Sequence, residues 1–260
     1  MQSVNGSDTS RKRILIAGSV LAALFGTARS GRGDAVTISD PVVFASPVTL
    51  SSGTSDWVYY GVPNDPTSNG NSNIGYEHAA ATNFSNVSAI QANLNGFDNT
   101  ASGYPLFNWS GGSPDSTGSS HSWAYDEFSS GNGLTFSLLV APGSETVSVY
   151  ANNFAPLSYE LEASLSSGAS APPDTASLPG NADLDHHYGV YTIGVANTSA
   201  VTETLTVAFI QTNSNGNANI GLYGASVAAV PEPASTGIAV IGCMGILARR
   251  WRNSESCEKP

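Results

Sequence analysis

The chain has 260 residues and a formal net charge of −11 at pH 7, but its charges are unevenly placed. All nine Lys and Arg residues lie before residue 36 or after residue 248, whereas residues 36–230 hold fifteen Asp and Glu and so carry a formal charge of −15. This segment excludes nucleic-acid binding, which needs Lys and Arg opposite phosphate, and also arginine clamps, lysine Schiff bases and P-loop chemistry. Both cysteines, Cys243 and Cys257, follow residue 230, so neither a disulfide nor a thiolate metal site supports the segment.

Residues 1–35 have the layout of a secretory signal peptide and a short leader. Arg11-Lys12-Arg13 precedes an apolar stretch of twelve residues, Ile14–Phe25, and small residues follow it. Twelve apolar residues are too few for a stable membrane span but suit the central region of a signal peptide. Cleavage after Ala28 and cleavage after Ala35 both fit the small-residue pattern, and the sequence leaves the choice open.

The body of the chain is predicted to be one domain over residues 36–228, long enough to bury a core of its own. It has no long helical periodicity. Short alternating runs, bounded by Gly, Pro, Asn or Asp, appear instead. They are Trp57–Tyr60, Val87–Leu94, Ser122–Phe128, Leu134–Val140, Thr146–Tyr150, Ser158–Leu165, Tyr188–Ala196, Thr204–Gln211 and Ile220–Val227. The pattern predicts an all-β fold, a single β-sandwich of the jelly-roll kind.

Aromatic residues in the first half of the body suggest a sugar-binding surface. Trp109 follows Asn108 and precedes a long Gly- and Ser-rich loop, and Trp57 lies in an alternating run. Sugar-binding modules stack pyranose rings on exposed aromatic faces, and amides bond the hydroxyl groups. Trp109, Asn108 and Trp57 are therefore the candidate ligand-binding residues. The alternative is that these rings belong to the core, as most aromatic residues on strands do.

Two polar segments are candidates for a cation site. Ser68–Gly75 recurs as Ser214–Gly221 with seven of eight positions matching, and the second copy contains Asn215 and Asn217. Asp183 and Asp185 stand just before two adjacent histidines. Carboxylate and amide oxygens are ligands that Ca²⁺ takes, and neighbouring Asp and His side chains can bind Zn²⁺, but the spacing matches no metal motif. The sequence therefore predicts no cofactor, with calcium as the one ion left open. Tight turns, for which Asn-Gly is well suited, and a solvated loop are the alternatives.

Hydrolytic motifs are absent from the body. Asp126 and Glu127 are adjacent, so on a strand they face opposite sides of the sheet and do not form a glycosidase pair. No Gly-x-Ser-x-Gly elbow appears. The sequence therefore predicts a protein that is not an enzyme.

The C-terminal segment, residues 229–252, has three parts in order. Pro231-Glu232-Pro233 is followed by an apolar run to Ala248 and then by Arg249, Arg250 and Arg252. The fifteen residues from Ala234 to Ala248 would make a helix of about 22 Å at about 1.5 Å per residue, shorter than a bilayer core of about 30 Å. The positive-inside rule places the arginines in the cytoplasm and the body on the other side.

This tail resembles the PEP-CTERM sorting signal of Gram-negative envelope proteins. The resemblance covers about residues 230–252 and implies recognition by an exosortase, a membrane transpeptidase. Residues 253–260 form a short polar tail beyond the usual end of the signal. The body resembles, more loosely, the galactose-binding-like jelly-roll domains. The stretches that carry this second resemblance lie within residues 130–228, and no binding residue is carried over from it.

Together these features predict a non-catalytic protein that is exported across the inner membrane, held there transiently by its C-terminal segment, and then sorted to the envelope or the extracellular matrix. Its expected partners are an exosortase and exopolysaccharide. Two alternatives stay open: a purely structural acidic surface protein, and a secreted carbohydrate-active hydrolase.

Overall fold

The computed structural model describes residues 33–51, 56–61, 70–72, 75–91, 94–98, 104–127, 129–154, 158–181, 186–213 and 219–229. The chain divides into two units, Met1–Gly33 and Asp34–Pro260, and all described residues but Gly33 belong to the second. Every regular element in the described ranges is a β-strand, so the predicted all-β fold is confirmed. Within these ranges no helix is long and apolar enough to cross a membrane. The predicted signal peptide and sorting signal lie outside the described residues.

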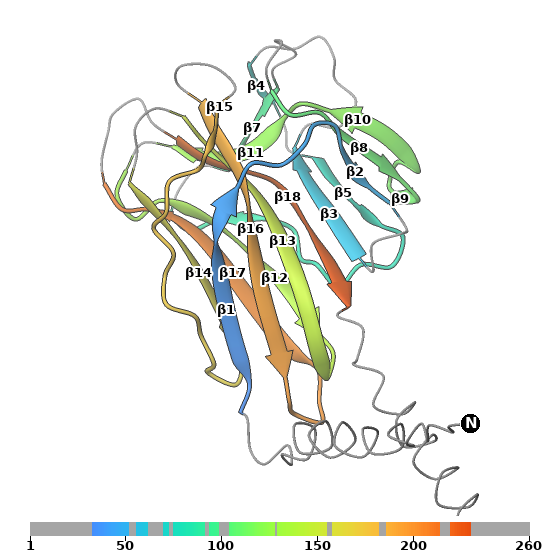
Figure 1. Cartoon of the computed structure of the whole chain (residues 1–260). Helices are drawn as coiled ribbons and strands as arrows, with labels where there is room; N and C mark the ends of the chain where they lie inside the picture. The colour runs from blue at the N-terminus through green and yellow to red at the C-terminus, as the bar shows by residue number, and fades with distance from the viewer. Residues whose placement is uncertain are drawn as a thin grey trace, which may run out of the picture. The chain divides into compact units, whose positions relative to one another are not determined.

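The largest sheet has eleven strands and a fork (Figure 1). Its neighbouring strands follow the order β1, β16, β13, β18. Beyond β18 the sheet divides into two branches: one continues with β11, β7 and β4, and the other with β3, β5 and β9. Strand β15 pairs with β16. The strands are β1 (Ala35–Val42), β3 (Asp56–Gly61), β4 (Gly70–Ser72), β5 (Gly75–Ala79), β7 (Asn95–Asp98), β9 (Gly112–Ser113), β11 (Trp123–Glu127), β13 (Gly143–Phe154), β15 (Gly180–Asn181), β16 (His186–Asn197) and β18 (Asn219–Ala229).

Two smaller sheets pack against this large sheet. The four-stranded sheet has the order β14, β17, β12, β6, and the three-stranded sheet has the order β10, β8, β2. Their strands are β14 (Tyr159–Leu165), β17 (Glu203–Gln211), β12 (Gly133–Val140), β6 (Ser88–Ala89), β10 (Thr117–Ser120), β8 (Phe107–Ser110) and β2 (Val48–Leu50). In Figure 1 the four-stranded sheet lies behind β1, β16 and β13, and the three-stranded sheet lies beside β3.

Alternation along each strand divides the core into two clusters on opposite faces of the large sheet. On β3, Val58 and Tyr60 belong to the cluster shared with the four-stranded sheet, whereas Trp57 and Tyr59 belong to the cluster shared with the three-stranded sheet. Successive side chains of a strand point to opposite faces, so both faces of β3 are covered. The predicted sandwich is therefore present, with a third layer that the sequence did not predict.

The fork in the large sheet occurs at a bulge in β18. Tyr150 pairs with Gly224 and Ala151 pairs with Leu222, which leaves Tyr223 as an extra residue. Before the bulge β18 pairs with β11, and after it with β3. A Cβ atom on Gly224 would lie 2.3 Å from the carbonyl oxygen of Val58, so only glycine allows β3 to approach here.

The two ends of strand β13 have different neighbours and lie far apart. At its start, Ser144 pairs with Ala196, which pairs with Ala35, and Glu145 pairs with Ala229. We call this the tail end, because the first and last strands of the domain begin and finish there. At its other end, Phe154 pairs with both His186 and Asn219; we call this the loop end. The strand has 12 residues, and the eleven steps between them, at about 3.3 Å each, place the two ends about 36 Å apart.

Most of the predicted strands are present, with different bounds. Eight of the nine predicted runs overlap strands β3, β11, β12, β13, β14, β16, β17 and β18. The run Val87–Leu94 is the exception, because only Ser88 and Ala89 form a strand there, β6.

Candidate functional site: an aromatic and amide cluster at the loop end

The structure places Trp57 and Trp109 inside the core. Trp57 is fully buried and Trp109 is 3% exposed. The Trp109 ring stacks on Tyr59, with 5.2 Å between ring centroids and 21° between ring planes. Neither indole therefore presents a face to solvent, and the prediction of an exposed platform at Trp109 is wrong. The physical reason is the third sheet, which covers this face of β3.

Asn108 lies on the opposite side of β8 from Trp109 and is partly exposed. Its neighbours across the three-stranded sheet are Thr49 on β2 and Ser119 on β10. These two side chains are exposed, so Asn108 sits in an outward-facing row of small polar residues. The structure thus separates the three predicted ligand-binding residues, with two in the core and one on the outer surface.

The predicted calcium ligands Asp183, Asp185, Asn215 and Asn217 lie outside the described residues. Within the described ranges, no group of three or more His, Cys, Asp or Glu side chains could hold a metal ion. Strand β16 follows Asp183 and Asp185 in the chain, and β18 follows Asn215 and Asn217. The first residues of these two strands, His186 and Asn219, both pair with Phe154 of β13. The sorting residues Pro231, Glu232, Pro233, Arg249, Arg250 and Arg252 also lie outside the described residues.

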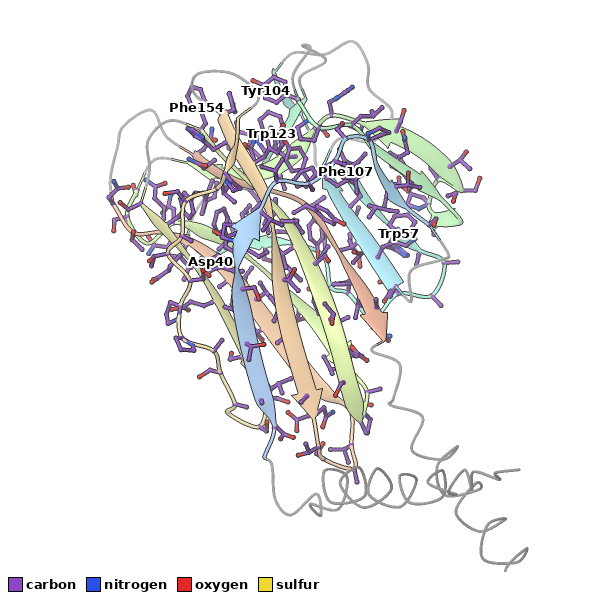
Figure 2. All side chains as sticks on the ribbon, in the orientation of Figure 1. Asp40, Trp57, Tyr104, Phe107, Trp123 and Phe154 are labelled. Atoms are coloured by element: carbon purple, nitrogen blue, oxygen red, sulfur yellow. The ribbon has the colours of Figure 1, made fainter. Side chains whose placement is uncertain are left out.

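The aromatic side chains of Tyr104, Trp123 and Phe154 gather at the loop end (Figure 2), and the His186 ring contacts all three. The His186 ring lies 4.5 Å from Phe154, 5.0 Å from Tyr104 and 5.7 Å from Trp123, measured between ring centroids. Tyr104 and Trp123 stack on each other at 5.3 Å. His186 and Tyr104 are each 8% exposed and Phe154 is partly exposed, so the outer members of this group reach the surface.

Hydrogen bonds fix the segment that carries Tyr104 and Trp123. The Tyr59 hydroxyl donates to the carbonyl oxygen of Ser122 at 2.7 Å, just before Trp123. The carbonyl oxygen of Tyr104 lies 3.1 Å from His121 Nδ1, a contact in which a protonated nitrogen donates. The rings are thus held by the same packed layer that buries Trp109.

A glycine lets the Trp123 indole lie against the large sheet. A Cβ atom on Gly221 would lie 2.5 Å from Cδ1 and 3.2 Å from Nε1 of Trp123. Gly221 pairs directly with Asn152 of β13, so the indole and the Asn152 side chain lie beside each other on the same face. The other cross-strand neighbour of Asn152 is Tyr188.

Asn152 is the polar centre of this region. Its side chain is 1% exposed, and among the described residues neither its Oδ1 nor its Nδ2 atom has a hydrogen-bond partner. The hydroxyl of Tyr223, which is fully buried nearby on β18, also has none among these residues. Burial raises the pKa of Tyr223 well above its usual value, so this hydroxyl stays protonated and able to donate. A buried polar group without a partner costs about 1–3 kcal/mol, so Asn152 is a polar group whose presence in the core needs an explanation.

We call Tyr104, Trp123, Asn152, Phe154 and His186 the loop-end cluster. It combines apolar ring faces with an amide that offers donors and an acceptor, the composition typical of a small-molecule or sugar site. Alternation predicted that Trp123 lies on a strand, and His186 was singled out only as a neighbour of Asp183 and Asp185. Asn152 was missed, although its signal is present: a polar residue within the apolar run of β13.

Comparison with known proteins identifies no family. No protein-family model matches the chain, and no curated protein matches it. Among solved structures, that of TmCBM61 in complex with β-1,4-galactotriose is similar, with a TM-score of 0.37 and 8% sequence identity over 56% of this chain and 88% of the other. At so low a score, neither the fold nor the ligand of that protein is carried over.

Proposed function

We propose that this chain is an exported, non-catalytic protein of the cell envelope or extracellular matrix that binds polysaccharide at the loop-end cluster. The observation that carries the proposal is Asn152, whose amide is buried beside Trp123 and has no partner in the part of the chain that the structure describes. A sugar hydroxyl both donates and accepts hydrogen bonds, so it can satisfy the Oδ1 and Nδ2 atoms together. The buried Trp123 ring packs next to the amide, and Tyr104, which stacks on it and is 8% exposed, supplies an apolar face at the surface.

Export and sorting form a second part of the proposal, supported by the sequence. The signal-peptide layout at residues 1–35 directs the chain out of the cytoplasm, and Pro231-Glu232-Pro233, the apolar run and the arginines direct it to an exosortase in the inner membrane. The structure of the domain is compatible with sorting at one end and binding at the other. Ala35 and Ala229 both lie at the tail end, seven to ten residues along β13 from Asn152 and Phe154, which is about 23–33 Å at about 3.3 Å per residue.

Binding is tested with the full chain and the variant Asn152→Leu on a panel of extracellular polysaccharides, with and without calcium. Leucine has nearly the same volume and removes an unsatisfied amide, so the variant should fold with equal or higher thermal stability and lose binding at least tenfold. Asn83→Leu, the same change at an exposed position, is the matched control and should bind normally. If the unmodified chain binds no polysaccharide under either condition, the binding part is wrong, and a structural surface protein becomes the better interpretation.

Sorting is tested separately by replacing Pro231, Glu232 and Pro233 with alanine in a host that carries an exosortase. The variant should stay in the membrane fraction with an uncleaved C-terminal segment. Release with the same mass as the unmodified protein would show that this motif does not direct processing.

A further inference from the structure

We infer that the polysaccharide bound by the loop-end cluster is uncharged; this inference rests on the proposed function. The first reason is the hydrogen-bonding capacity of Asn152. Among the described residues its amide has both a donor, Nδ2, and an acceptor, Oδ1, without partners. A hydroxyl group can satisfy both, whereas a carboxylate or sulfate group placed against this amide only accepts and leaves Oδ1 without a donor.

The second reason is the charge around the cluster. Anionic polymers are held by Lys and Arg side chains, and the sequence has none between residues 33 and 248. The sequence from residue 36 to residue 230 carries fifteen Asp and Glu residues instead. A polymer with one negative charge per sugar would therefore meet like charge with no cation to offset it.

The third reason is the character of the surfaces that line the cluster. The ring planes of Tyr104 and Trp123 are 26° apart, whereas the His186 ring stands at 78° to Tyr104 and 67° to Trp123. The Tyr104 and His186 rings are each 8% exposed, so they bring apolar ring faces to the surface, which suit the C–H faces of a neutral sugar ring. Burial against apolar walls strengthens the penalty for a charged group, because its hydration shell is lost.

The test compares each neutral polymer that the full chain binds with the same polymer after oxidation of its C6 hydroxyl groups to carboxylates. Titrations in EDTA at about 20 mM and about 500 mM salt separate screening from contact, since the Debye length falls well below 10 Å above about 0.1 M salt. We expect the neutral polymer to bind with a Kd that changes less than twofold between the two salt concentrations. The oxidised form should bind at least tenfold more weakly at low salt and recover in part at high salt.

Other outcomes overturn the inference in distinguishable ways. Equal or tighter binding of the oxidised polymer, or binding of anionic polymers alone, contradicts an uncharged ligand and leaves polysaccharide binding intact. Binding of the oxidised polymer only when calcium replaces EDTA would assign recognition to a bridging cation, which also contradicts it. Binding of neither form by the full chain removes the proposed binding function itself.

Discussion

Trp109 stacks on Tyr59 inside the layer between the large sheet and the three-stranded sheet, and both rings are buried. The pair joins β8 to β3, so it stabilises the contact between two sheets. We expect Trp109→Ala to lower the free energy of unfolding by about 3–5 kcal/mol, the usual cost of removing a large buried ring. Urea unfolding measures this.

The control for Trp109 is its neighbour Asn108, which faces outward on the same strand. Asn108→Ala should change the free energy of unfolding by less than about 0.5 kcal/mol, as surface substitutions do. A Trp109→Ala variant that keeps its stability but loses sugar binding would restore the exposed platform predicted from the sequence.

Gly221 gives a prediction about the loop-end cluster. An added methyl group would meet the Trp123 indole and lie 3.0 Å from the carbonyl oxygen of Ala124, so Gly221→Ala should displace the ring. We expect a loss of about 1–3 kcal/mol in stability, typical of overpacking, and a changed near-ultraviolet circular dichroism signal from Trp123. Gly194→Ala is the control, because its added methyl group meets only the hydroxyl of the exposed Thr37. Equal effects of the two substitutions would show that Trp123 is not held by contact with Gly221.

The sequence predicted the strands better than it predicted their surroundings. Alternating residues in β14 and β17 are buried on one face and open on the other, so their period of two was easily recognised. All six residues of β3 are buried, so the alternation of its residues does not show which sheet covers each face of the strand. Trp109 was therefore interpreted as an exposed ring. The layer that covers it contains β2 and β8, strands of only three and four residues, too short to give a periodic signal.

The candidate site was hard to predict for a different reason. Its members come from β11, β13, β16 and the segment before β8, and only the pairing of Phe154 with His186 and of Asn152 with Gly221 brings them together. Pairing between strands far apart in the sequence leaves no local pattern. Asn152 could have been noticed as a polar residue in an apolar run, but its lack of a partner is visible only in the structure.

Asp34 links the start of the domain to the turn after β16, and this gives a prediction about processing. Its Oδ1 atom accepts hydrogen bonds from the Thr198 backbone N–H at 2.7 Å and from the Thr198 hydroxyl at 2.9 Å. Cleavage after Ala35 would remove Asp34 and the first residue of β1, whereas cleavage after Ala28 keeps both. We therefore expect N-terminal sequencing of the exported protein to begin at Arg29. A sequence beginning at Val36 would show that these contacts are dispensable.

The same aspartate should make stability depend on pH. Hydrogen bonds from the Thr198 amide and then its hydroxyl lower the pKa of Asp34 below its usual value of 3.8. The contribution is therefore present above that value and is lost as the pH falls through the lower pKa of the folded state. Asp34→Asn should lower the Tm near neutral pH, and its difference from the unmodified chain should shrink in acid. Asp40→Asn, at an exposed position on β1, is the control for the loss of one negative charge.

Glu77 predicts the opposite dependence on pH. Its side chain is 1% exposed; Oε2 accepts a hydrogen bond from the Asp115 backbone N–H at 3.0 Å, and Oε1 has no partner. Burial raises the pKa of Glu77 above its usual value of 4.5; the Asp115 carboxylate adds to this rise, and the Asp115 N–H and then the charge of His78 oppose it. A raised pKa means that the folded state binds the proton more tightly, so the contribution of Glu77 to stability is greatest below pH 4.5 and is lost as the pH rises through the folded-state value.

Glu77→Gln keeps an oxygen for the Asp115 amide and removes the charge. The variant should match the unmodified chain below about pH 4.5 and exceed its Tm increasingly as the pH rises toward neutrality, because only the unmodified chain must then bury a carboxylate. Thermal melts across this range measure the difference, and Glu162→Gln, an exposed position on β14, controls for the change in net charge. A Tm difference that does not change with pH would mean that Glu77 ionises as freely in the folded protein as in the unfolded chain.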